Sequence, residues 1–346
     1  MVLRNFCLVG CTDPCNEVVR VKDASGHWKT FYVRDKLDTG GFSQIDLVFD
    51  KVSKRSFALK RILCHSKDDE SKALKEANFQ LNLPDHPNLL SCIASGLQHV
   101  SRRKQGAISE VLLVLSYSKR GTLQREIDHR SARNVMFPLY LIKTMMIGIC
   151  DGLIALLSFD IPMSHRDIKP GNVLLFEEMR PVLMDFGSAT PSILPIESIR
   201  DAEKWKFAEE NCSLTYRAPE LFNPITYETI TEKADVWAST FLRLFMPEYL
   251  FQSLGCLFYA LIFFKSPMDF VHARGDSVAL AACSANIYFP IDSCSKVPPE
   301  LIKLMKAMLS ANPQDRPSLT QIVESFKNLP EEIMYCNNQS AITYSL

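Results

Sequence analysis

The chain has 346 residues, with 39 Lys and Arg balanced by 39 Asp and Glu, so its formal net charge is zero. The apolar share of 47% is that of a globular protein with a sizeable core. It excludes a disordered chain, which needs low hydrophobicity and high net charge. The absence of a basic excess argues against nucleic acid as the main partner. At roughly 100–200 residues per domain, the length allows two modest domains or one two-lobed unit.

The first third of the sequence reads as short strands and one helix. Apolar or alternating runs of strand length occupy Trp28–Val33, Gln44–Phe49, Ser56–Leu63 and Glu110–Leu115. Between them, Asp69–Leu83 carries apolar residues near a 3.6-residue spacing and is followed by prolines, which predicts a helix.

Long helical patterns dominate the rest of the chain. They cover Leu139–Phe159, Glu300–Leu309 and Leu319–Leu329, and the change from strands to helices falls near Ser116–Gly121. The most apolar stretch, Ser253–Phe264, is 12 residues long, which suits a buried core helix better than a membrane span of about 20 residues. A membrane span over residues 239–264 is the rival reading, although charged residues and a proline interrupt it.

The eleven cysteines predict free thiols in a reducing compartment. Their number is odd, and Arg4, Asn5 and Asp13 interrupt what would otherwise be an N-terminal signal peptide. We therefore expect a cytoplasmic protein without structural disulfides.

Three polar side chains lie close together in the segment SHRDIKPGNVLL, residues 164–175. Asp167, Lys169 and Asn172 can together orient a hydroxyl, neutralise a phosphate oxygen and hold a metal. Asp185 follows a second apolar run and precedes Phe186 and a glycine. A carboxylate there is a suitable second ligand for Mg²⁺, which takes one or two carboxylates plus substrate phosphates.

A second charged pair is predicted upstream. Lys60 lies within an apolar strand, so its ammonium must face a negative group, and Glu76 on the following helix is a plausible partner. The glycine pair Gly40 and Gly41, followed by Ser43, forms a turn between strands whose backbone amides can approach phosphates.

In this order, from Phe31 to Leu329, these segments resemble a eukaryotic protein kinase catalytic domain. The resemblance implies an α+β, two-lobed fold with a small β-rich N-lobe and a larger helical C-lobe. The chain would divide into a Cys-containing tail (1–28), an N-lobe (29–117), a C-lobe (118–330) and a C-terminal tail (331–346).

More local motifs are similar to those of the Numb-associated kinase family, and most of all to its short, lipid-modified member. They are GGFSxxDLV, ALKRILCH, KRGTL, PVLMDFGSA, TYRAPELF and GDSVALA, which begin at residues 40, 58, 119, 181, 215 and 275.

The resemblance assigns a role to each matching position. Asp167 would be the catalytic base and Lys169 would stabilise the transferring phosphoryl group, while Asn172 and Asp185 would hold Mg²⁺. ATP would be bound by Gly40, Gly41, Ser43, Ile45, Ala58, Lys60, Glu76, Leu115, Tyr117 and Leu174. Glu220 and Arg316 would form an ion pair, and the Ser213 hydroxyl would touch the catalytic loop. We expect the charged groups to converge on one pocket.

Three features depart from the family pattern. Asp38 replaces the first glycine of the Gly-rich loop, which would weaken ATP affinity. An atypical insert, residues 238–252, separates Asp235-Val236-Trp237 from Ser253-Leu254-Gly255. The insert is open to two readings, a retained intron, mispredicted exon or isoform, or a functional loop. Val2 excludes N-myristoylation from this start site, and Cys7, Cys11 and Cys15 are open either to palmitoylation or to being free thiols in a tail.

Together these features predict a serine/threonine protein kinase that transfers the γ-phosphoryl group of ATP, with Mg²⁺, to Ser or Thr hydroxyls of protein substrates. The rival is a pseudokinase scaffold made inactive by the 238–252 insert. The resemblance implies work at Golgi or other trafficking membranes through a peripheral contact. The sequence leaves the oligomeric state open.

Overall fold

The computed structural model describes residues 17–40, 43–99, 106–192, 194–195, 212–217, 219, 222, 229–230, 252–290 and 297–329. The chain divides into two compact units. The first unit comprises Met1–Asp85 and Leu90–Tyr117, and the second comprises His86–Leu89 and Ser118–Leu346.

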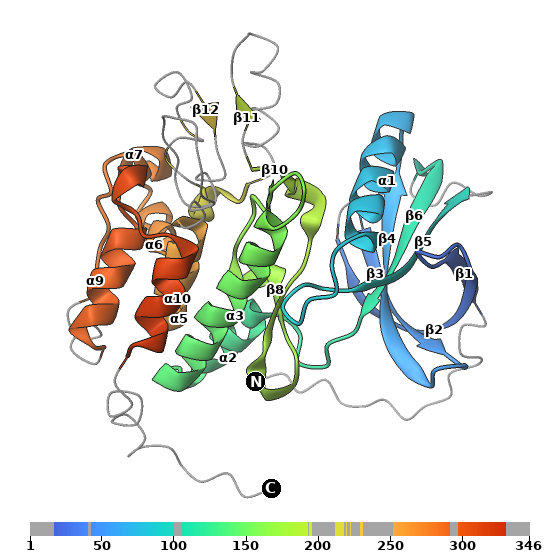
Figure 1. Cartoon of the computed structure of the whole chain (residues 1–346), viewed down its shortest axis with the longest axis horizontal. Coiled ribbons are helices and arrows are strands. Elements are labelled where there is room, and N and C mark those ends of the chain that lie inside the picture. The colour runs from blue at the N-terminus through green and yellow to red at the C-terminus, as the bar shows by residue number, and fades with distance from the viewer. Residues whose placement is uncertain are drawn as a thin grey trace, which may run out of the picture. The chain divides into compact units, whose positions relative to one another are not determined.

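The first unit is built on a closed antiparallel barrel with the strand order β1-β2-β3-β4-β6-β5 (Figure 1). Its strands are β1 (Val18–Lys22), β2 (Trp28–Thr39), β3 (Ser43–Asp50), β4 (Arg55–Cys64), β5 (Cys92–His99) and β6 (Ser109–Ser116). Helix α1 (Lys67–Leu81) follows β4 and packs against β4, β5 and β6. Alternate side chains fill the barrel, because successive strand residues point to opposite faces. They include Val19, Val21, Phe31, Val33, Val48, Phe57, Leu59, Ala94, Leu112 and Val114.

A charged residue is also buried in this unit. Arg61 on β4 is 2% exposed, and its guanidinium donates to Asp46 at 2.7 Å, Glu17 at 2.8 Å and Glu110 at 3.3 Å. Burial alone would lower the pKa of this guanidinium, but the hydrogen bond to Asp46 and the three carboxylate charges outweigh it and raise the pKa. Arg61 therefore stays charged, and its pairing offsets the cost of removing it from water.

The predicted N-terminal tail of residues 1–28 is too long. Val18–Lys22 forms β1, which pairs with β2 from Val18 opposite Tyr32 to Lys22 opposite Trp28. The physical reason is the alternation in this segment, which places Val19 and Val21 in the barrel core at 2% and 1% exposure. The predicted strands at Trp28, Gln44, Ser56 and Glu110 are present with longer ends.

Helix α1 begins two residues earlier than its apolar spacing predicted. Ser66 is the N-cap, its hydroxyl accepts from the Asp69 amide, and the Asp69 carboxylate accepts from the Ser66 amide. This reciprocal capping box satisfies two backbone donors that a helix start would otherwise leave unpaired. The helix ends at Leu81 with Asn82 as its C-cap, before the prolines that were expected to end it.

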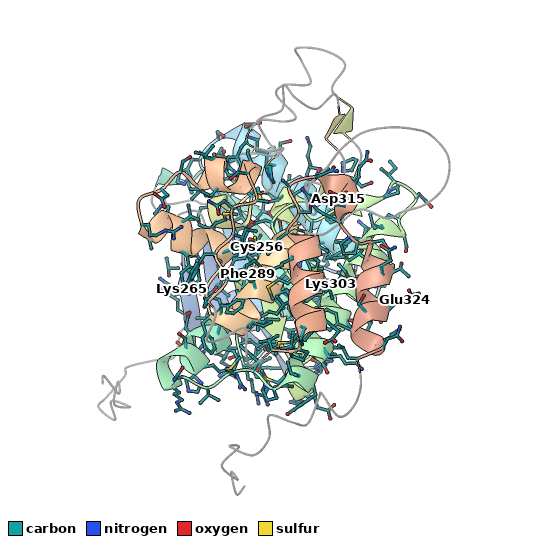
Figure 2. The ribbon with its side chains drawn as sticks, turned by 90° about the vertical axis from the view of Figure 1, so that its left-hand side faces the viewer. Cys256, Lys265, Phe289, Lys303, Asp315 and Glu324 are labelled. Atoms are coloured by element: carbon teal, nitrogen blue, oxygen red, sulfur yellow. The ribbon has the colours of Figure 1, made fainter. Side chains whose placement is uncertain are left out.

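The second unit is mainly helical. Its helices are α2 (Leu123–Arg133), α3 (Leu139–Leu157), α5 (Gln252–Phe263), α6 (Pro267–Ala273), α7 (Val278–Cys283), α9 (Pro299–Met308) and α10 (Leu319–Lys327). Short strands pair as β7 (Met163–Ser164) with β10 (Thr190–Pro191), β8 (Val173–Leu175) with β9 (Pro181–Leu183), and β11 (Leu194–Pro195) with β12 (Thr229–Ile230). Figure 2 looks onto these helices, with Cys256 of α5, Lys303 of α9 and Glu324 of α10 labelled.

The core of the second unit lies between α3, α5, α9 and α10. Phe258 of α5 meets Phe326 of α10 edge-on, with ring centroids 5.2 Å apart. Ser253–Phe263 is buried throughout, as expected of a core helix. Among the described helices, α3 is the one long and apolar enough by itself to cross a membrane, yet 61% of that window is buried inside the protein. A mostly buried apolar helix is equally typical of a globular core.

The prediction of an α+β fold with a β-rich N-terminal part and a helical C-terminal part is confirmed. Several predictions fall outside the described residues. They concern Gly41, Glu220, the cysteines at 7, 11 and 15, and residues 238–251 of the insert, whose last residue, Gln252, begins α5.

Candidate active site

The loop between β7 and β8 carries the first cluster of functional side chains. Arg166 adopts a left-handed backbone conformation with φ of +68°, which is uncommon for a residue other than glycine. Its side chain is 1% exposed and donates to the carbonyls of Pro191 at 3.2 Å and Ser192 at 3.0 Å. These bonds fix the turn that presents Asp167, the next residue.

The Asp167 carboxylate is held by three donors. Its Oδ2 accepts from Lys169 Nζ at 2.7 Å and from Asn172 Nδ2 at 2.8 Å, and its Oδ1 accepts from the Ser213 amide at 3.0 Å. Lys169 Nζ also donates to Ser213 Oγ at 2.7 Å. Asp167 is 7% exposed, so this buried carboxylate is fixed in one orientation by charged and neutral hydrogen bonds.

The β8–β9 hairpin brings Asn172 and Asp185 to one end of the same pair of strands. Val173, which follows Asn172, lies opposite Leu183, and the Met184 amide donates to the Asn172 carbonyl at 3.0 Å. Asp185 is exposed and has a left-handed φ of +66°. The reversal it makes allows the next residue, Phe186, to turn inward.

Phe186 is 2% exposed and packs against the ring of His165, with centroids 5.2 Å apart. His165 Nε2 lies 3.0 Å from the Met184 carbonyl oxygen. The histidine therefore joins the loop of Asp167 to the segment of Asp185.

The first unit holds the second charged group. Lys60 Nζ lies 2.8 Å from Glu76 Oε1, and their side chains are 17% and 15% exposed. Lys60 is paired with Ile45 across β3 and β4, and Ala58 with Leu115 across β4 and β6. Directly opposed residues point to the same face of a sheet, so these apolar side chains share the face of the Lys60 ammonium.

The turn between β2 and β3 carries the expected glycines. The Gly40 amide donates to the Ser43 carbonyl at 2.8 Å, which closes the turn. Asp38, which departs from the family pattern, lies opposite Ile45 and is exposed. Its Oδ1 accepts from the backbone amide of the next residue, Thr39, at 2.7 Å.

The structure thus brings the predicted residues together within each unit. Lys60 lies with Glu76 in the first, whereas Asp167, Lys169 and Asn172 form one hydrogen-bonded group in the second. Tyr117 ends the first unit and Leu174 lies in β8 of the second. The roles of all these residues remain predictions.

Two further sequence expectations concern the activation segment. The Ser213 hydroxyl does contact the catalytic loop, through Lys169. Arg316 is 7% exposed and donates to the carbonyls of Ser310 and Ala311 at 2.8 and 3.0 Å, while its expected partner Glu220 lies outside the described residues. Sequence reasoning missed the anchoring by Arg166. The available signal was an arginine beside the key aspartate, but nothing local to it indicates partners 24 to 26 residues away.

Phosphotransferases use this set of side chains: a buried, oriented aspartate with a lysine, an amide and a nearby second carboxylate. The protein kinase domain family matches residues 31–326. The chain therefore belongs to the protein kinase family.

The curated relatives place it among the serine/threonine kinases. It is 36% identical to serine/threonine-protein kinase 16 of Rattus norvegicus and of Homo sapiens, over 87% of this chain and 90% of each relative. It is also 28% identical to serine/threonine-protein kinase ppk13 of Schizosaccharomyces pombe, over 89% of this chain and 91% of the relative.

Proposed function

We propose that the chain transfers the γ-phosphoryl group of ATP to serine or threonine hydroxyls of protein substrates. The observation that carries this proposal is the Asp167 carboxylate, held by Lys169, Asn172 and the Ser213 amide. A carboxylate in this fixed orientation is suited to accept the proton of an attacking hydroxyl, because its lone pairs do not need to reorganise.

Lys169 supplies positive charge beside that base. Its ammonium lies between the Asp167 carboxylate and the Ser213 hydroxyl, at 2.7 Å from each. There it would neutralise negative charge that develops on the transferring phosphoryl group, while Asp167 takes the hydroxyl proton.

The side chains also fit a divalent cation. Asn172 donates its Nδ2 to both the carbonyl and the carboxylate of Asp167, which leaves its Oδ1 as an acceptor. Asp185 supplies a carboxylate from the same end of the β8–β9 pair. Oxygen donors of this kind suit Mg²⁺, which when bound would shield the charge of the phosphates.

In the first unit, the Lys60–Glu76 ion pair would present one ammonium to the phosphates. The backbone of Gly40, Gly41 and Ser43 would cover them. Leu174, in the second unit, and four first-unit residues would supply contacts for the adenine: Ile45, Ala58, Leu115 and Tyr117.

At a finer level, we propose that the chain is one of the Numb-associated kinases and resembles the family's myristoylated and palmitoylated serine/threonine kinase. The support is the set of local motifs from Gly40 to Ala281. From that likeness we further propose a cytoplasmic kinase with peripheral contact to Golgi or trafficking membranes through Cys7, Cys11 and Cys15.

A transfer assay with labelled ATP and a generic protein substrate tests the enzyme. We expect the full chain to label the substrate, and both Asp167→Asn and Asp185→Ala to lower labelling by about 100-fold or more. Asp160→Asn is the matched control, because Asp160 is an exposed aspartate outside this cluster. Equal labelling by the wild type and by both site variants would contradict the proposal.

The pseudokinase alternative rests on the insert at residues 238–252, which interrupts a family motif. Deletion of Ala238–Gln252 distinguishes the two readings. If the insert inactivates the protein, the deletion should raise transfer from background to a level that Asp185→Ala abolishes. If the full chain is active and the deletion does not increase phosphoryl transfer, the pseudokinase alternative is wrong.

A further inference from the structure

The outward face of strands β1, β2 and β3 combines basic and aromatic side chains. Along β1 the side chains alternate, so that Val19 and Val21 are buried in the barrel whereas Arg20 and Lys22 are exposed. Lys22 lies directly opposite Trp28 at the start of β2. Because directly opposed residues point to the same face of a sheet, Trp28 shares the outward face with the two cations.

The same face continues across β2 to β3. Tyr32 of β2 lies opposite Val18 of β1 on one side and opposite Phe49 of β3 on the other. Val18 is exposed and follows the same alternation as Arg20 and Lys22, so both rings belong to the outward face. We call this surface the basic-aromatic face, which carries Arg20, Lys22, Trp28, Tyr32 and Phe49.

A cation lies over each of its three rings. The distances to the ring centroids are 5.1 Å for Lys22 over Trp28, 3.7 Å for Lys51 over Tyr32 and 5.3 Å for Arg34 over Phe49. A cation held by a ring keeps its full charge but has a fixed position. Trp28 nevertheless remains 66% exposed. The face therefore presents positioned positive charges beside exposed aromatic surface.

The acids next to this face are engaged by the turns. Asp23 Oδ1 accepts from two backbone amides of the β1–β2 turn at 3.0 and 2.9 Å. Asp50 accepts from two backbone amides of the β3–β4 turn at 2.9 and 3.1 Å. Among the described residues, no ion pair engages the three cations that lie over rings. Their charge is therefore available to an anionic partner.

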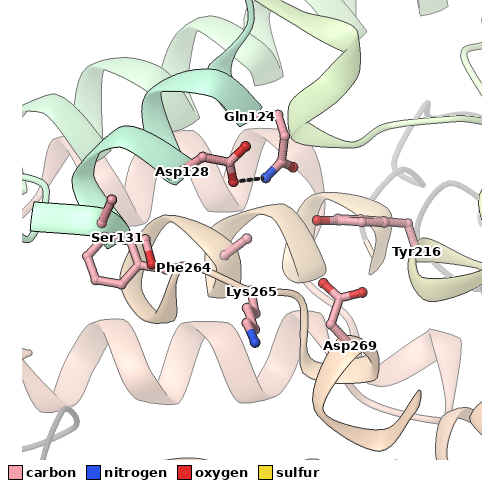
Figure 3. A pocket seen from close by; sticks show the side chains of 9 residues that line it. Gln124, Asp128, Ser131, Tyr216, Phe264, Lys265 and Asp269 are labelled. Atoms are coloured by element: carbon pink, nitrogen blue, oxygen red, sulfur yellow. Dashed lines mark hydrogen bonds between the residues drawn. The ribbon is translucent and has the colours of Figure 1, made fainter. Parts of the chain in front are cut away.

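The second unit contains stacked lysines in different surroundings. Lys265 and Lys306 also lie over phenylalanine rings, at 6.0 and 5.2 Å from the centroids. Lys265, however, lines a pocket of about 470 Å³ together with Asp128 and Asp269 (Figure 3). Acidic neighbours offset its charge, so a stacked lysine does not by itself make a basic surface.

We propose that the basic-aromatic face docks on a membrane surface that contains anionic phospholipid. Anionic lipids attract lysine and arginine side chains near the bilayer, and tryptophan and tyrosine favour the level of the headgroups. Lys22 and Lys51 would meet the lipid phosphates while Trp28 enters the interface. The inference adds a surface to the peripheral membrane contact proposed above, and it requires neither acylation nor phosphoryl transfer.

A membrane fits this face better than a nucleic acid does. Bases bind by stacking on open ring faces, whereas a cation already lies over each of these three rings. At a bilayer interface, an aromatic ring needs only an apolar body and a polar edge among the headgroups. The segment Val2–Val9, which precedes β1 in the chain, is mostly apolar and supplies further surface that a bilayer can bury.

Vesicle sedimentation with the full chain tests the proposal. The parent protein would carry Cys7→Ser, Cys11→Ser and Cys15→Ser, so that no acyl chain contributes to binding. We expect vesicles of phosphatidylcholine with about 30% phosphatidylserine to bind at least about 10-fold more tightly than phosphatidylcholine alone. Raising the salt from about 0.1 M to about 0.5 M should weaken this binding, because the charges are screened.

Lys22→Gln combined with Lys51→Gln removes two of the stacked cations. Each cation near an anionic bilayer contributes about fivefold to binding, so this double variant should bind about 25-fold more weakly. Lys265→Gln combined with Lys306→Gln is the matched control, since it removes the same charge from two exposed lysines over rings. It should bind as the parent does, and thermal melts verify that both double variants are folded.

Tryptophan fluorescence provides a second readout. Brominated lipid quenches a tryptophan that enters the interface, so the bound parent should lose fluorescence. Much of this quenching should be absent in Trp28→Phe, which keeps an aromatic ring at the same position. Quenching that is the same in Trp28→Phe as in the parent would overturn the proposed orientation of the face.

The proposal is also overturned if anionic vesicles bind no more tightly than neutral ones, or if the control pair weakens binding as much as the Lys22 and Lys51 pair. Loss of single-stranded DNA binding in the Lys22 and Lys51 variant, with unchanged vesicle binding, would assign the face to nucleic acid instead. Asp185→Ala separates the proposal from the proposed function. It should bind vesicles as the parent does, so an inactive chain that still binds anionic vesicles would support the face and contradict only the kinase activity.

Discussion

Lys60 illustrates at the scale of one residue how a buried charge is made tolerable. It lies in the middle of β4 with its side chain 17% exposed, and Glu76 on α1 provides the opposite charge at 2.8 Å. The pair also fixes the ammonium in one place, which a flexible four-carbon side chain would not do alone. The same contact therefore serves stability and positions a charge for phosphate binding.

Replacing Lys60 by Met should lower phosphoryl transfer by about 100-fold or more, because the phosphates lose a positioned positive charge. The loss in stability should be small, since Glu76 is 15% exposed and can recover water. Labelled-ATP assays and thermal melts measure both. Lys36→Met, at an exposed position on β2, serves as control. Activity within threefold of wild type in Lys60→Met would contradict the assigned role.

Cys92 provides a pH-dependent prediction. Burial raises the pKa of its thiol to about 12, so almost no thiolate is present at pH 8. We expect iodoacetamide at pH 8 to modify the exposed Cys283 at least 10-fold faster than Cys92, as peptide mass spectrometry would show. Since an unfolded cysteine titrates near 8.5, the protonated thiol contributes stability below that pH, and this contribution declines as the pH rises toward 12. Equal labelling rates would contradict the raised pKa of the Cys92 thiol.

At the scale of elements, the close approach of α3 to its neighbours depends on two glycines. A Cβ at Gly148 would lie 2.7 Å from Asn88 Nδ2 and from Pro181 Cγ, and one at Gly152 would lie 2.9 Å from the Asn88 carbonyl oxygen. Asn88 in turn donates its Nδ2 to the Pro181 carbonyl at 2.8 Å. Helix α3 thus supports β9, the strand that leads to Asp185.

Gly148→Ala should therefore destabilise the protein by about 1–3 kcal/mol despite the higher helix propensity of alanine, because the packed neighbours must move. Denaturant unfolding gives the free energy. Thr144→Ala, on the exposed side of the same helix, should change it by less than about 0.5 kcal/mol. A neutral or stabilising Gly148→Ala would show that the contact with Asn88 and Pro181 is loose.

At the scale of the whole molecule, each of the two units carries its own part of the charged machinery. The first is a closed barrel that contains a buried arginine, and the second is a helical unit built around α3 and α5. The barrel tolerates Arg61 because three carboxylates reach it from β3, β6 and the residue before β1. The network ties segments from residue 17 to residue 110 into one unit.

Arg61→Met should destabilise the first unit by about 3–5 kcal/mol, because Asp46 and Glu110 would remain buried without a counter-charge. A thermal melt should show this loss. Arg55→Met, an exposed arginine on the same strand, is the control. Unchanged stability in Arg61→Met would mean that the buried pairs contribute little.

The sequence by itself determined the class of the protein and most of its elements. Local periodicity predicted four strands and the helices α1, α3, α9 and α10, because an amphipathic pattern indicates which face of an element is buried. It did not predict β1, β5 or α2. Helix α2 is largely polar and buries only Leu123 and Ile127, too few for a clear period.

Only the tertiary structure decided which groups meet. The anchoring of Arg166 by Pro191 and Ser192 and the support of Asp167 by Ser213 join residues 25 to 46 positions apart. Spacing along a chain carries no information on such contacts, because they depend on how helices and turns pack. The sequence therefore identified the residues that carry the chemistry, and the packing of the elements determined where each charge points.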